Sequence, residues 1–321
     1  MNKVEPQASQ QMIDLSIVII SYNTIDFTRA CLDSVISRLG KLTAEIIVVD
    51  NASMDGSAEM VKELFPSVRL IPNNKNVGFA AANNQAFLLA QGDFVLLLNS
   101  DTVVLGDVLP NSVDYLRAHS QVGAIGCRVL NTDRSMQRTC SGYPSLLRLL
   151  IMTLGLDRLP INNALDSYQL RNWQRDTDRE VEVISGCYLL VRRSIIESVG
   201  PMDDSFFFFG EETDWCIRMR RAGWKLRFAP VGEIIHHGGG SVKKLNYRRD
   251  VMLAEATIRL HKKNSGKTAA AVAFMILAMF ILSRALAWTA CSLVRPACRA
   301  RAAYFRKILA HTFETWPKER A

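Results

Sequence analysis

Short apolar segments alternate with segments of helical periodicity along the N-terminal part of the chain. The apolar segments, rich in β-branched residues, are residues 15–20, 45–50, 68–71 and 94–98. Between them, apolar residues recur at the spacing of a helix, as in residues 78–90 (GFAAANNQAFLLA). Apolar strands separated by helices at this rhythm predict an α/β fold with a mostly parallel sheet, covered by helices on both faces.

Three of the predicted strands end in polar residues. The ends are Ser21-Tyr22-Asn23, Asp50-Asn51 and Asn99-Ser100-Asp101. A single Asp in such a place is more often a turn residue or a helix cap. In a parallel sheet, however, ligands bind outside the carboxyl ends of the strands. Because three strand ends carry polar groups, we expect all three to face one crevice, where Asp101 supplies an oxygen ligand.

A second group of acids follows four consecutive phenylalanines. In residues 206–224 (FFFFGEETDWCIRMRRAGW), Glu211, Glu212 and Asp214 precede a helical pattern. One acid at a helix N-terminus is explained by the helix dipole. Three acids with aromatic neighbours on both sides are different, because apolar walls raise the energy of a charged carboxylate and shift its pKa. A carboxylate aimed from a helix start suits a general base, and we predict one in this cluster.

The second half of the chain adds two further features. Residues 234–241 (IIHHGGGS) place two histidines after an apolar segment and before three glycines, which favours a ligand or phosphate-contacting loop over a structural role. Residues 131–180 predict a loop-rich insertion with some helix, suited to cover a substrate. A strand followed by a short helix is expected over residues 182–200.

Charge is unevenly distributed along the 321 residues. Residues 241–321 carry 16 Lys and Arg against 4 Asp and Glu, whereas the first 240 residues carry 23 against 27. The basic character therefore belongs to the tail, which indicates contact with an anionic surface and argues against a nucleic-acid-binding body. The seven cysteines lack zinc-like spacing, and the N-terminus lacks the apolar segment of a secretory signal. We expect reduced core thiols and a cytoplasmic body.

The basic tail contains a long apolar segment. Residues 268–283 are uncharged, Arg284 interrupts, and the apolar pattern continues to Val294. The uninterrupted part is shorter than the roughly 20 residues that span a bilayer, and basic residues on both sides give no orientation signal. A helix buried against the body is one alternative and a single span is another. We favour a hairpin or an interfacial helix held by apolar burial and anionic lipid.

Together these motifs resemble the inverting family-2 glycosyltransferases of the GT-A fold. The matching segments, in order, are SIVIISYN, IIVVDNASMDGS, NKNVGFAAANNQA, FVLLLNSDT, ISGCYLLVRR, FFFFGEETDWCIRMRRAGW and HHGGGS. The resemblance is strongest to bacterial rhamnosyltransferases of surface-polysaccharide assembly. It implies a catalytic domain over residues 13–262 with a Rossmann-like sheet, and it leaves residues 263–321 as a membrane-associated helical tail.

The resemblance also assigns residues to the donor. They are Tyr22, Asn23, Asp50, Asn51, Asn76, Gly78, Phe79, Asn99 and Gly186. Tyr22 and Asp50 match positions that contact the nucleobase. Asn76, Gly78 and Phe79 match the loop near the ribose and the diphosphate.

Metal and base positions follow from the same resemblance. Residues 99–101 match the metal-binding DxD motif with Asn99 in place of the first Asp, so Asp101 is the expected direct ligand of Mg²⁺ or Mn²⁺. His236 matches a second metal ligand. The pair Glu211 and Glu212 matches the acidic pair that holds the base, with Glu212 as the expected base and Asp214 in reserve.

This assignment has a simple chemical logic. A nucleoside diphosphate leaves with several negative charges, which a divalent cation neutralises, so no general acid is required. One carboxylate then takes the proton of the attacking hydroxyl, and direct displacement inverts the anomeric centre. The expected reaction moves L-rhamnose from dTDP-rhamnose, or a sugar from a UDP donor, onto a lipid-linked saccharide. The expected place is the cytoplasmic face of the bacterial inner membrane, in the synthesis of O-antigen or another surface polysaccharide.

Several alternatives remain at this level. The donor sugar could instead be a hexose or galactofuranose. An oxidoreductase would need GxGxxG after the first strand, where SYNTID stands. A nucleotidyltransferase would need a basic, glycine-rich loop near the N-terminus. A catalytically degenerate membrane scaffold would have no use for acids enclosed by phenylalanines, although such a protein could retain them.

Overall fold

The computed structural model describes residues 12–158, 168–238 and 247–316. The strands of the main sheet are β1 (Leu15–Ser21), β2 (Ala44–Asp50), β3 (Arg69–Pro72), β4 (Phe94–Asn99), β5 (Thr102–Val104), β6 (Val122–Leu130), β8 (Arg179–Glu180), β10 (Tyr188–Arg192) and β11 (Lys225–His236). Their order is β3-β2-β1-β4-β10-β6-β11-β5, and β8 pairs with β11. The two short strands β7 (Cys140–Ser141) and β9 (Val183–Ile184) form a separate pair.

The predicted mostly parallel sheet is confirmed, with β10, β5 and β8 running opposite to the other strands. Strands β1 to β4 are parallel to one another, and β6 is parallel to β11. Strand β10 is antiparallel to both β4 and β6. The reason is that the chain leaves β6 at the carboxyl edge, makes its excursion over residues 131–187 there, and must run back through the sheet.

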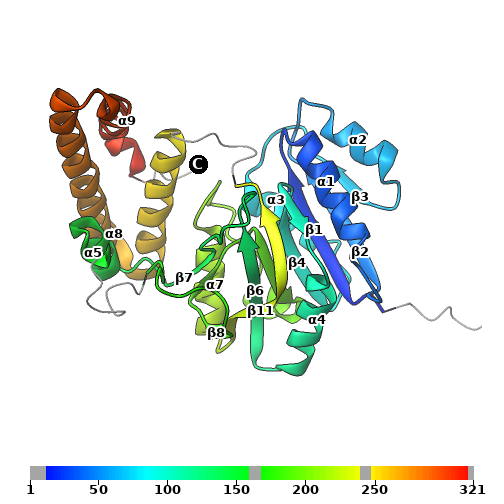
Figure 1. The fold of residues 1–321 in the computed structure, drawn as a ribbon. Helices are drawn as coiled ribbons and strands as arrows, with labels where there is room; N and C mark the ends of the chain where they lie inside the picture. Colours follow the sequence, from blue (N-terminus) through cyan, green and yellow to red (C-terminus); the bar gives the residue numbers. More distant parts are fainter. Residues whose placement is uncertain (1–11, 159–167, 239–246, 317–321) are drawn as a thin grey trace, which may run out of the picture.

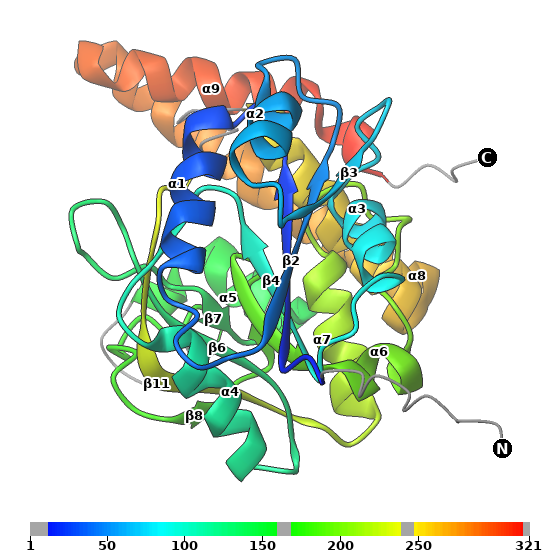
Figure 2. The same ribbon diagram turned by 90° about the vertical axis from the view of Figure 1, so that its right-hand side faces the viewer.

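Helices cover both faces of the sheet, as predicted (Figure 2). One face is covered by α1 (Ile25–Ile36), α2 (Ser57–Leu64) and α4 (Val108–Ala118). The other is covered by α3 (Phe79–Phe87), α6 (Arg193–Val199) and α7 (Glu211–Arg221). Alternate residues of the central strands point to the two helix layers, so that Leu96 and Leu97 belong to different cores. A strand buried on both faces must be apolar throughout, which explains its continuous apolar sequence.

The polar ends of β1, β2 and β4 lie level at one edge. Ser21 pairs with Asp50 across β1 and β2, and Ile20 pairs with Asn99 across β1 and β4. The register therefore places the side chains that follow each strand at the same carboxyl edge. This is the arrangement that the sequence pattern predicts.

A group of helices stands beside the sheet and contains α5 (Leu146–Leu154), α8 (Tyr247–Val294) and α9 (Arg299–Ala310) (Figure 1). Short 3-10 turns lie at Leu156–Arg158, Pro296–Cys298 and Thr312–Thr315. Helix α8 consists of two helical segments joined at Gly266, whose φ of 87° is non-helical. The first segment lies next to the sheet domain, and the second packs on α5 through Ile276 and Leu149. Helix α8 runs through the expected boundary at residue 262 without a break, and the division into two domains stays a prediction.

The expectation of seven reduced cysteines is wrong for two of them. Cys291 and Cys298 are joined by a disulfide, because the chain turns at Arg295 after α8 and brings their Cα atoms to 6.0 Å. The remaining five, Cys31, Cys127, Cys140, Cys187 and Cys216, are free and buried. Burial raises the pKa of each of these thiols, that of Cys31 to about 12, so they are inert core residues.

Candidate active site

Strand pairing brings Asp101 and His236 together. Strand β5 starts directly after Asp101 and pairs antiparallel with the end of β11, with Thr102 opposite His236. The backbone N–H of His237 donates to the carbonyl of Asp101 at 2.9 Å and holds this corner closed. As a result, Nε2 of His236 lies 3.2 Å from Oδ1 of Asp101. Residues that are 135 positions apart in sequence share one corner of the sheet edge, as the resemblance implies.

Gln137 fixes which nitrogen of His236 faces Asp101. The side-chain amide N–H of Gln137 donates to the carbonyl of His236 at 2.6 Å, so its Oε1 must be the atom 2.9 Å from Nδ1. Nδ1 therefore carries the proton and donates to Gln137. Nε2 is then the ring nitrogen that faces Asp101, with the amide nitrogen of Asn99 at 3.2 Å from it. Sequence reasoning missed Gln137, which lies in the loop-rich insertion.

This corner fits a hard divalent cation. Nε2 of His236 and Oδ1 of Asp101 lie 3.2 Å apart, and both are ligand types that divalent metal ions accept. Two ligands on neighbouring octahedral positions, each about 2 Å from Mg²⁺, lie about 3 Å apart. Within residues 12–158, 168–238 and 247–316, no three His, Cys, Asp or Glu side chains form a complete metal cage. Asp101 and His236 would thus hold a cation that completes its shell with substrate oxygens and water.

Asp50 has an unused hydrogen-bond acceptor at the strand edge. Its carboxylate is buried, and Oδ2 accepts from the backbone N–H of Ser53 at 2.9 Å. Oδ1 has no hydrogen-bond partner among the described residues. A buried carboxylate oxygen without a partner is costly, and a ligand N–H would satisfy it. The neighbouring Tyr22 is 40% exposed, while Asn23 uses its Oδ1 to accept from the backbone N–H of Met54.

Asn51 and Asn76 hold a loop instead of presenting free groups. The amide of Asn51 donates to Oδ1 of Asn76 at 2.9 Å, and its oxygen accepts from the backbone N–H of Val77 at 3.0 Å. Oδ1 of Asn76 also accepts from the backbone N–H of Gly78 at 3.0 Å. Asn51 and Asn76 would therefore contribute to a donor site by fixing the shape of the loop over residues 73–78. The sequence pattern alone did not indicate this role.

Gly78 and Phe79 connect this loop to the acidic cluster. Gly78 has a φ of 89°, and a Cβ there would lie 2.5 Å from the carbonyl oxygen of Phe207. That same carbonyl accepts from the backbone N–H of Phe79 at 2.9 Å. A Cβ on Gly186 would lie 3.3 Å from the Phe79 ring. The predicted donor loop is therefore packed against Phe207, which lies just before the acidic pair, and Gly78 leaves no room there for a side chain.

Glu211 and Glu212 begin α7 as a pair of adjacent carboxyls with little access to solvent. Glu211 is buried, and Oε2 of each residue has no hydrogen-bond partner among the described residues. Burial and then the charge of Glu212 raise the pKa of Glu211 well above its ordinary range. Burial also raises the pKa of Glu212, although backbone hydrogen bonds oppose the shift. Because the charge of Glu212 adds to burial in raising the pKa of Glu211, we expect Glu212 to be the member of the pair that ionises first.

Glu212 and His236 line the same cavity, which has a volume of about 330 Å³. Tyr168 and Arg138 of the insertion also line it, as do Leu253 and Leu260 of α8. Since His236 contacts Asp101, the cavity connects the candidate base with the candidate metal corner. The second histidine does not belong here, because the His237 ring packs 4.9 Å from the Phe27 ring. The glycines at 239 and 240 lie outside the described residues.

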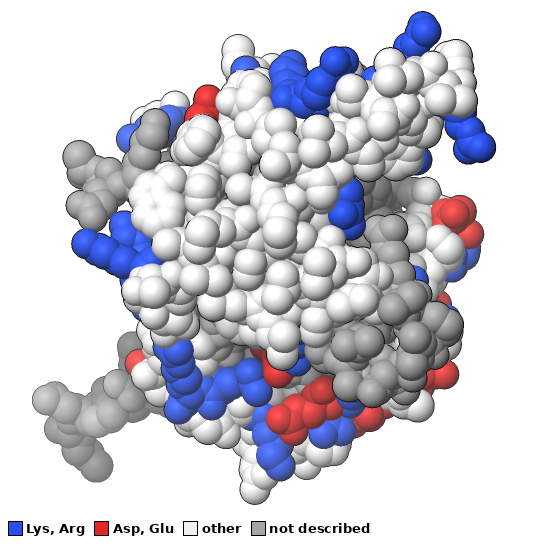
Figure 3. Space-filling view, turned by 90° about the vertical axis from the view of Figure 1, so that its left-hand side faces the viewer, with Lys and Arg blue, Asp and Glu red and all other residues white. Residues whose placement is uncertain are grey.

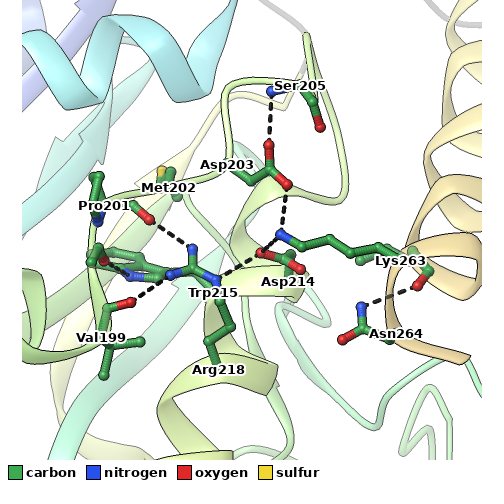
Figure 4. Close-up of polar contacts among 12 residues, drawn as sticks. Val199, Pro201, Met202, Asp203, Ser205, Asp214, Trp215, Arg218, Lys263 and Asn264 are labelled. Atoms are coloured by element: carbon green, nitrogen blue, oxygen red, sulfur yellow. Dashed lines mark hydrogen bonds and ion pairs between the residues drawn. The ribbon is translucent and has the colours of Figure 1, made fainter. Parts of the chain in front are cut away.

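Asp214 is not available as a base. Its side chain is fully buried, and Oδ2 accepts from Nε of Arg218 and Nζ of Lys263, both at 2.9 Å (Figure 4). It does not line the cavity that contains Glu212. Glu212 therefore stays the expected base, since it lines the cavity and Asp214 is engaged by Arg218 and Lys263.

Comparison with known proteins adds a family and a fold. Residues 16–200 match the model of Glycosyl transferase family 2. An N-acetylglucosaminyl-diphospho-decaprenol L-rhamnosyltransferase of Mycobacterium tuberculosis is 30% identical over 209 residues, which cover 60% of this chain and 66% of the relative. The O-antigen biosynthesis protein RfbC of Myxococcus xanthus is 25% identical over 240 residues, 71% of this chain and 17% of that protein. The chain thus spans less than two thirds of the length of either relative.

A solved structure extends the comparison to the fold. A mannosyltransferase from Pyrobaculum calidifontis, solved in complex with GDP-Man and Mn²⁺, superposes with a TM-score of 0.57 at 17% identity. The superposition covers 97% of this chain and 89% of the other. At this identity the likeness concerns the fold alone, and it confirms the predicted GT-A architecture.

Proposed function

The chain belongs to glycosyl transferase family 2, and on that premise we propose that it is an inverting transferase of a nucleotide-activated sugar. The observation that carries the proposal is the cavity that joins Glu212 to His236, with Asp101 behind the histidine. The proposed acceptor is a lipid-linked saccharide, and the proposed donor is dTDP-rhamnose. The rhamnosyltransferase relative supports both choices. A hexose or galactofuranose donor is the alternative.

Each group has a separate role in the proposed mechanism. Oδ1 of Asp50 would accept the N–H of the nucleobase, and the loop shaped by Asn51 would border the sugar and diphosphate. Asp101 and His236 would hold Mg²⁺ or Mn²⁺, which neutralises the charge of the departing diphosphate. Glu212 accepts the proton of the acceptor hydroxyl as that hydroxyl attacks the anomeric carbon from the opposite side. Glu211 stays neutral beside it.

A donor screen tests the proposed reaction. We expect full-length protein with Mn²⁺ to hydrolyse or transfer one sugar among labelled dTDP-rhamnose, UDP-glucose, UDP-galactofuranose and GDP-mannose. The measurement is release of the nucleoside diphosphate, with the same mixture in EDTA as the control. Turnover of UDP-galactofuranose alone would replace the rhamnose assignment. If the protein binds nucleotide but turns over no donor, the catalytically degenerate scaffold would replace the transferase assignment.

The helices beside the sheet support a membrane partner. Helix α8 is the one helix in the described part of the chain that is long and apolar enough to cross a membrane, and only 28% of its most apolar window is buried. Figure 3 shows that this side of the molecule has a broad uncharged face with lysine and arginine at its edges. The exposed apolar side chains of α5 and α8 include Leu147, Leu154, Met275, Met279, Leu282 and Leu286.

Arg284 does not interrupt this face. Its guanidinium donates to the carbonyl of Thr153 in the last turn of α5 at 3.2 Å and lies 4.7 Å from the centre of the Phe280 ring. The positive charge of Arg284 thereby lies at the C-terminus of α5, where the helix dipole favours it. We propose that α5 and the second segment of α8 lie on the cytoplasmic face of the bacterial inner membrane, with apolar side chains in the acyl boundary and basic side chains on anionic headgroups.

Vesicle flotation tests this attachment. We expect full-length protein to float with vesicles that contain anionic lipid, and to remain bound in 0.5 M salt because apolar burial contributes. Met279→Glu with Leu286→Glu should lose flotation, since it places two charges on side chains that are 44% and 64% exposed. Leu88→Glu is the matched control, because Leu88 of the sheet domain is 86% exposed. Wild-type protein that stays in the soluble fraction at low salt would rule the attachment out.

A further inference from the structure

One lysine of α8 reaches both ends of the segment that carries the acidic pair (Figure 4). Nζ of Lys263 donates to Oδ2 of Asp203 at 2.5 Å and to Oδ2 of Asp214 at 2.9 Å. Asp203 begins the phenylalanine loop, defined here as residues 203–210, and Asp214 lies in the first turn of α7. Glu211 and Glu212 stand between these two contacts. The ammonium group of Lys263 therefore links the two ends of the segment that carries the candidate base.

The phenylalanine loop has a conformation that needs such support. Phe209 has a φ of 68° and Gly210 a φ of 88°, directly before Glu211. A bulky residue in the left-handed region is strained, and the surrounding structure must hold it there. The loop lies against α8, because a Cβ on Gly210 would lie 3.2 Å from Cβ of Ala256. Hydrogen bonds from Lys263 and Ser205 lower the pKa of Asp203 despite partial burial, which agrees with a charged contact.

The body of α7 also has anchoring contacts that do not involve Lys263. Arg218 donates to the carbonyls of Val199 and Pro201 at 2.9 and 2.7 Å, and Nε1 of Trp215 donates to the carbonyl of Gly200 at 2.9 Å. Nε of Arg218 also contacts Oδ2 of Asp214 at 2.9 Å, and we expect this contact to remain when Lys263 is replaced. Loss of the lysine should therefore leave α7 folded and release the loop before it.

We propose that Lys263 is a positioning residue that sets the phenylalanine loop, and with it Glu212, from the tail helix. The proposal rests on the proposed transferase function for its catalytic consequence. Lys263 lies three residues before the bend at Gly266, after which α8 becomes apolar. Helix α8, which we propose to meet the bilayer, would thus also hold Glu212 in position. The sheet domain alone would not determine the conformation of the phenylalanine loop.

Kinetics of Lys263→Met in the full chain test the proposal. We expect kcat to fall about 10-fold or more, since small misplacement of a catalytic group has effects of this order. The loss should fall mainly on kcat, with a smaller rise in the donor KM, because Phe207 of the same loop accepts from the backbone N–H of Phe79 in the donor loop. Lys263→Arg should restore most of the rate. Lys267→Met is the matched control: it removes the same charge from the same helix, and Lys267 has no ion pair among the described residues.

Two further measurements keep the outcome interpretable. Titration with a nucleoside diphosphate counts folded sites, so that kcat refers to folded protein only. Amide hydrogen exchange in detergent should rise over residues 203–214 in Lys263→Met and not in Lys267→Met. Asp203→Asn should reproduce part of the loss of kcat and add little to Lys263→Met, and it replaces that variant if the latter fails to fold.

The results separate this proposal from the proposed function. Wild-type kcat in Lys263→Met, an equal loss in Lys267→Met, or unchanged exchange over residues 203–214 would overturn the positioning role. If the wild-type protein turns over no donor, the proposed transferase function fails instead. Increased exchange would then still support the structural contact from Lys263, and its absence would reject it.

Discussion

Glu212→Gln is expected to lower kcat by about 10²-fold or more and to leave the fold and donor binding unchanged. The side chain lines the cavity shared with His236, and the amide has the shape of the carboxyl but cannot accept a proton. Steady-state kinetics with the donor found by screening measures the loss. Circular dichroism and nucleotide titration show whether the variant is folded and still binds. Near-normal turnover by folded Glu212→Gln would refute the base assignment.

Glu211→Gln is the matched control, one residue away on the same helix. Burial and the charge of Glu212 keep the pKa of Glu211 high, so the neutral amide imitates the form already present. We expect its kcat to stay within a few-fold of wild type. If Glu211→Gln abolishes turnover and Glu212→Gln does not, the two roles must be exchanged. If both abolish it, the pair acts as a unit.

The pH dependence provides an independent check on the same pair. A base must be deprotonated, and burial raises the pKa of Glu212 above the ordinary value of a glutamate. The rate should therefore fall as pH drops through that raised pKa, and the acid limb should remain in Glu211→Gln. Because their pKa values are raised, these carboxyls bind more protons in the folded state than in the unfolded state. The free energy of unfolding therefore falls as pH rises through the raised pKa values, which is the opposite of what a salt-bridged acid does. Glu211→Gln should remove part of that decline.

Local periodicity was sufficient for the strands and for the edge where their polar ends meet. An apolar strand such as residues 94–98 reports burial on both faces, and consecutive parallel strands leave their ends at one edge. The acidic helix start was visible for the same reason, since Glu211 and Glu212 interrupt an apolar pattern. These predictions depend only on residues that are close in sequence, and a local sequence pattern records such residues directly.

Contacts between distant residues were not accessible in this way. Lys263 and Asp214 are 49 positions apart, and Gln137 and His236 are 99 apart. Nothing in the spacing of Glu211, Glu212 and Asp214 shows that only the third is neutralised by cations. The direction of β10 and the pairing of Cys291 with Cys298 likewise depend on how the chain returns after an excursion. Which carboxylate of the acidic cluster can react is therefore decided by tertiary contacts.

Asp101→Ala is expected to lower kcat by about 10²-fold or more, because it removes one of the two side chains that would hold the cation. His236 alone, with its lone pair directed by Gln137, would keep only weak affinity. A readout that does not depend on turnover is available. In wild-type protein, Mn²⁺ should strengthen binding of a nucleoside diphosphate, and this gain should disappear in Asp101→Ala while metal-free binding through Asp50 persists.

Asp114→Ala serves as the control for Asp101→Ala, because Asp114 is a surface carboxylate of α4 whose side chain is 72% exposed. It should leave both turnover and the Mn²⁺ effect unchanged. Asn99→Ala should cost less than Asp101→Ala, since the Asn99 amide nitrogen contacts the His236 ring and offers no carboxylate. Full Mn²⁺-dependent binding in folded Asp101→Ala would show that the cation, if used, is held elsewhere. The strand end at residues 99–101 would then be a turn with no part in the chemistry.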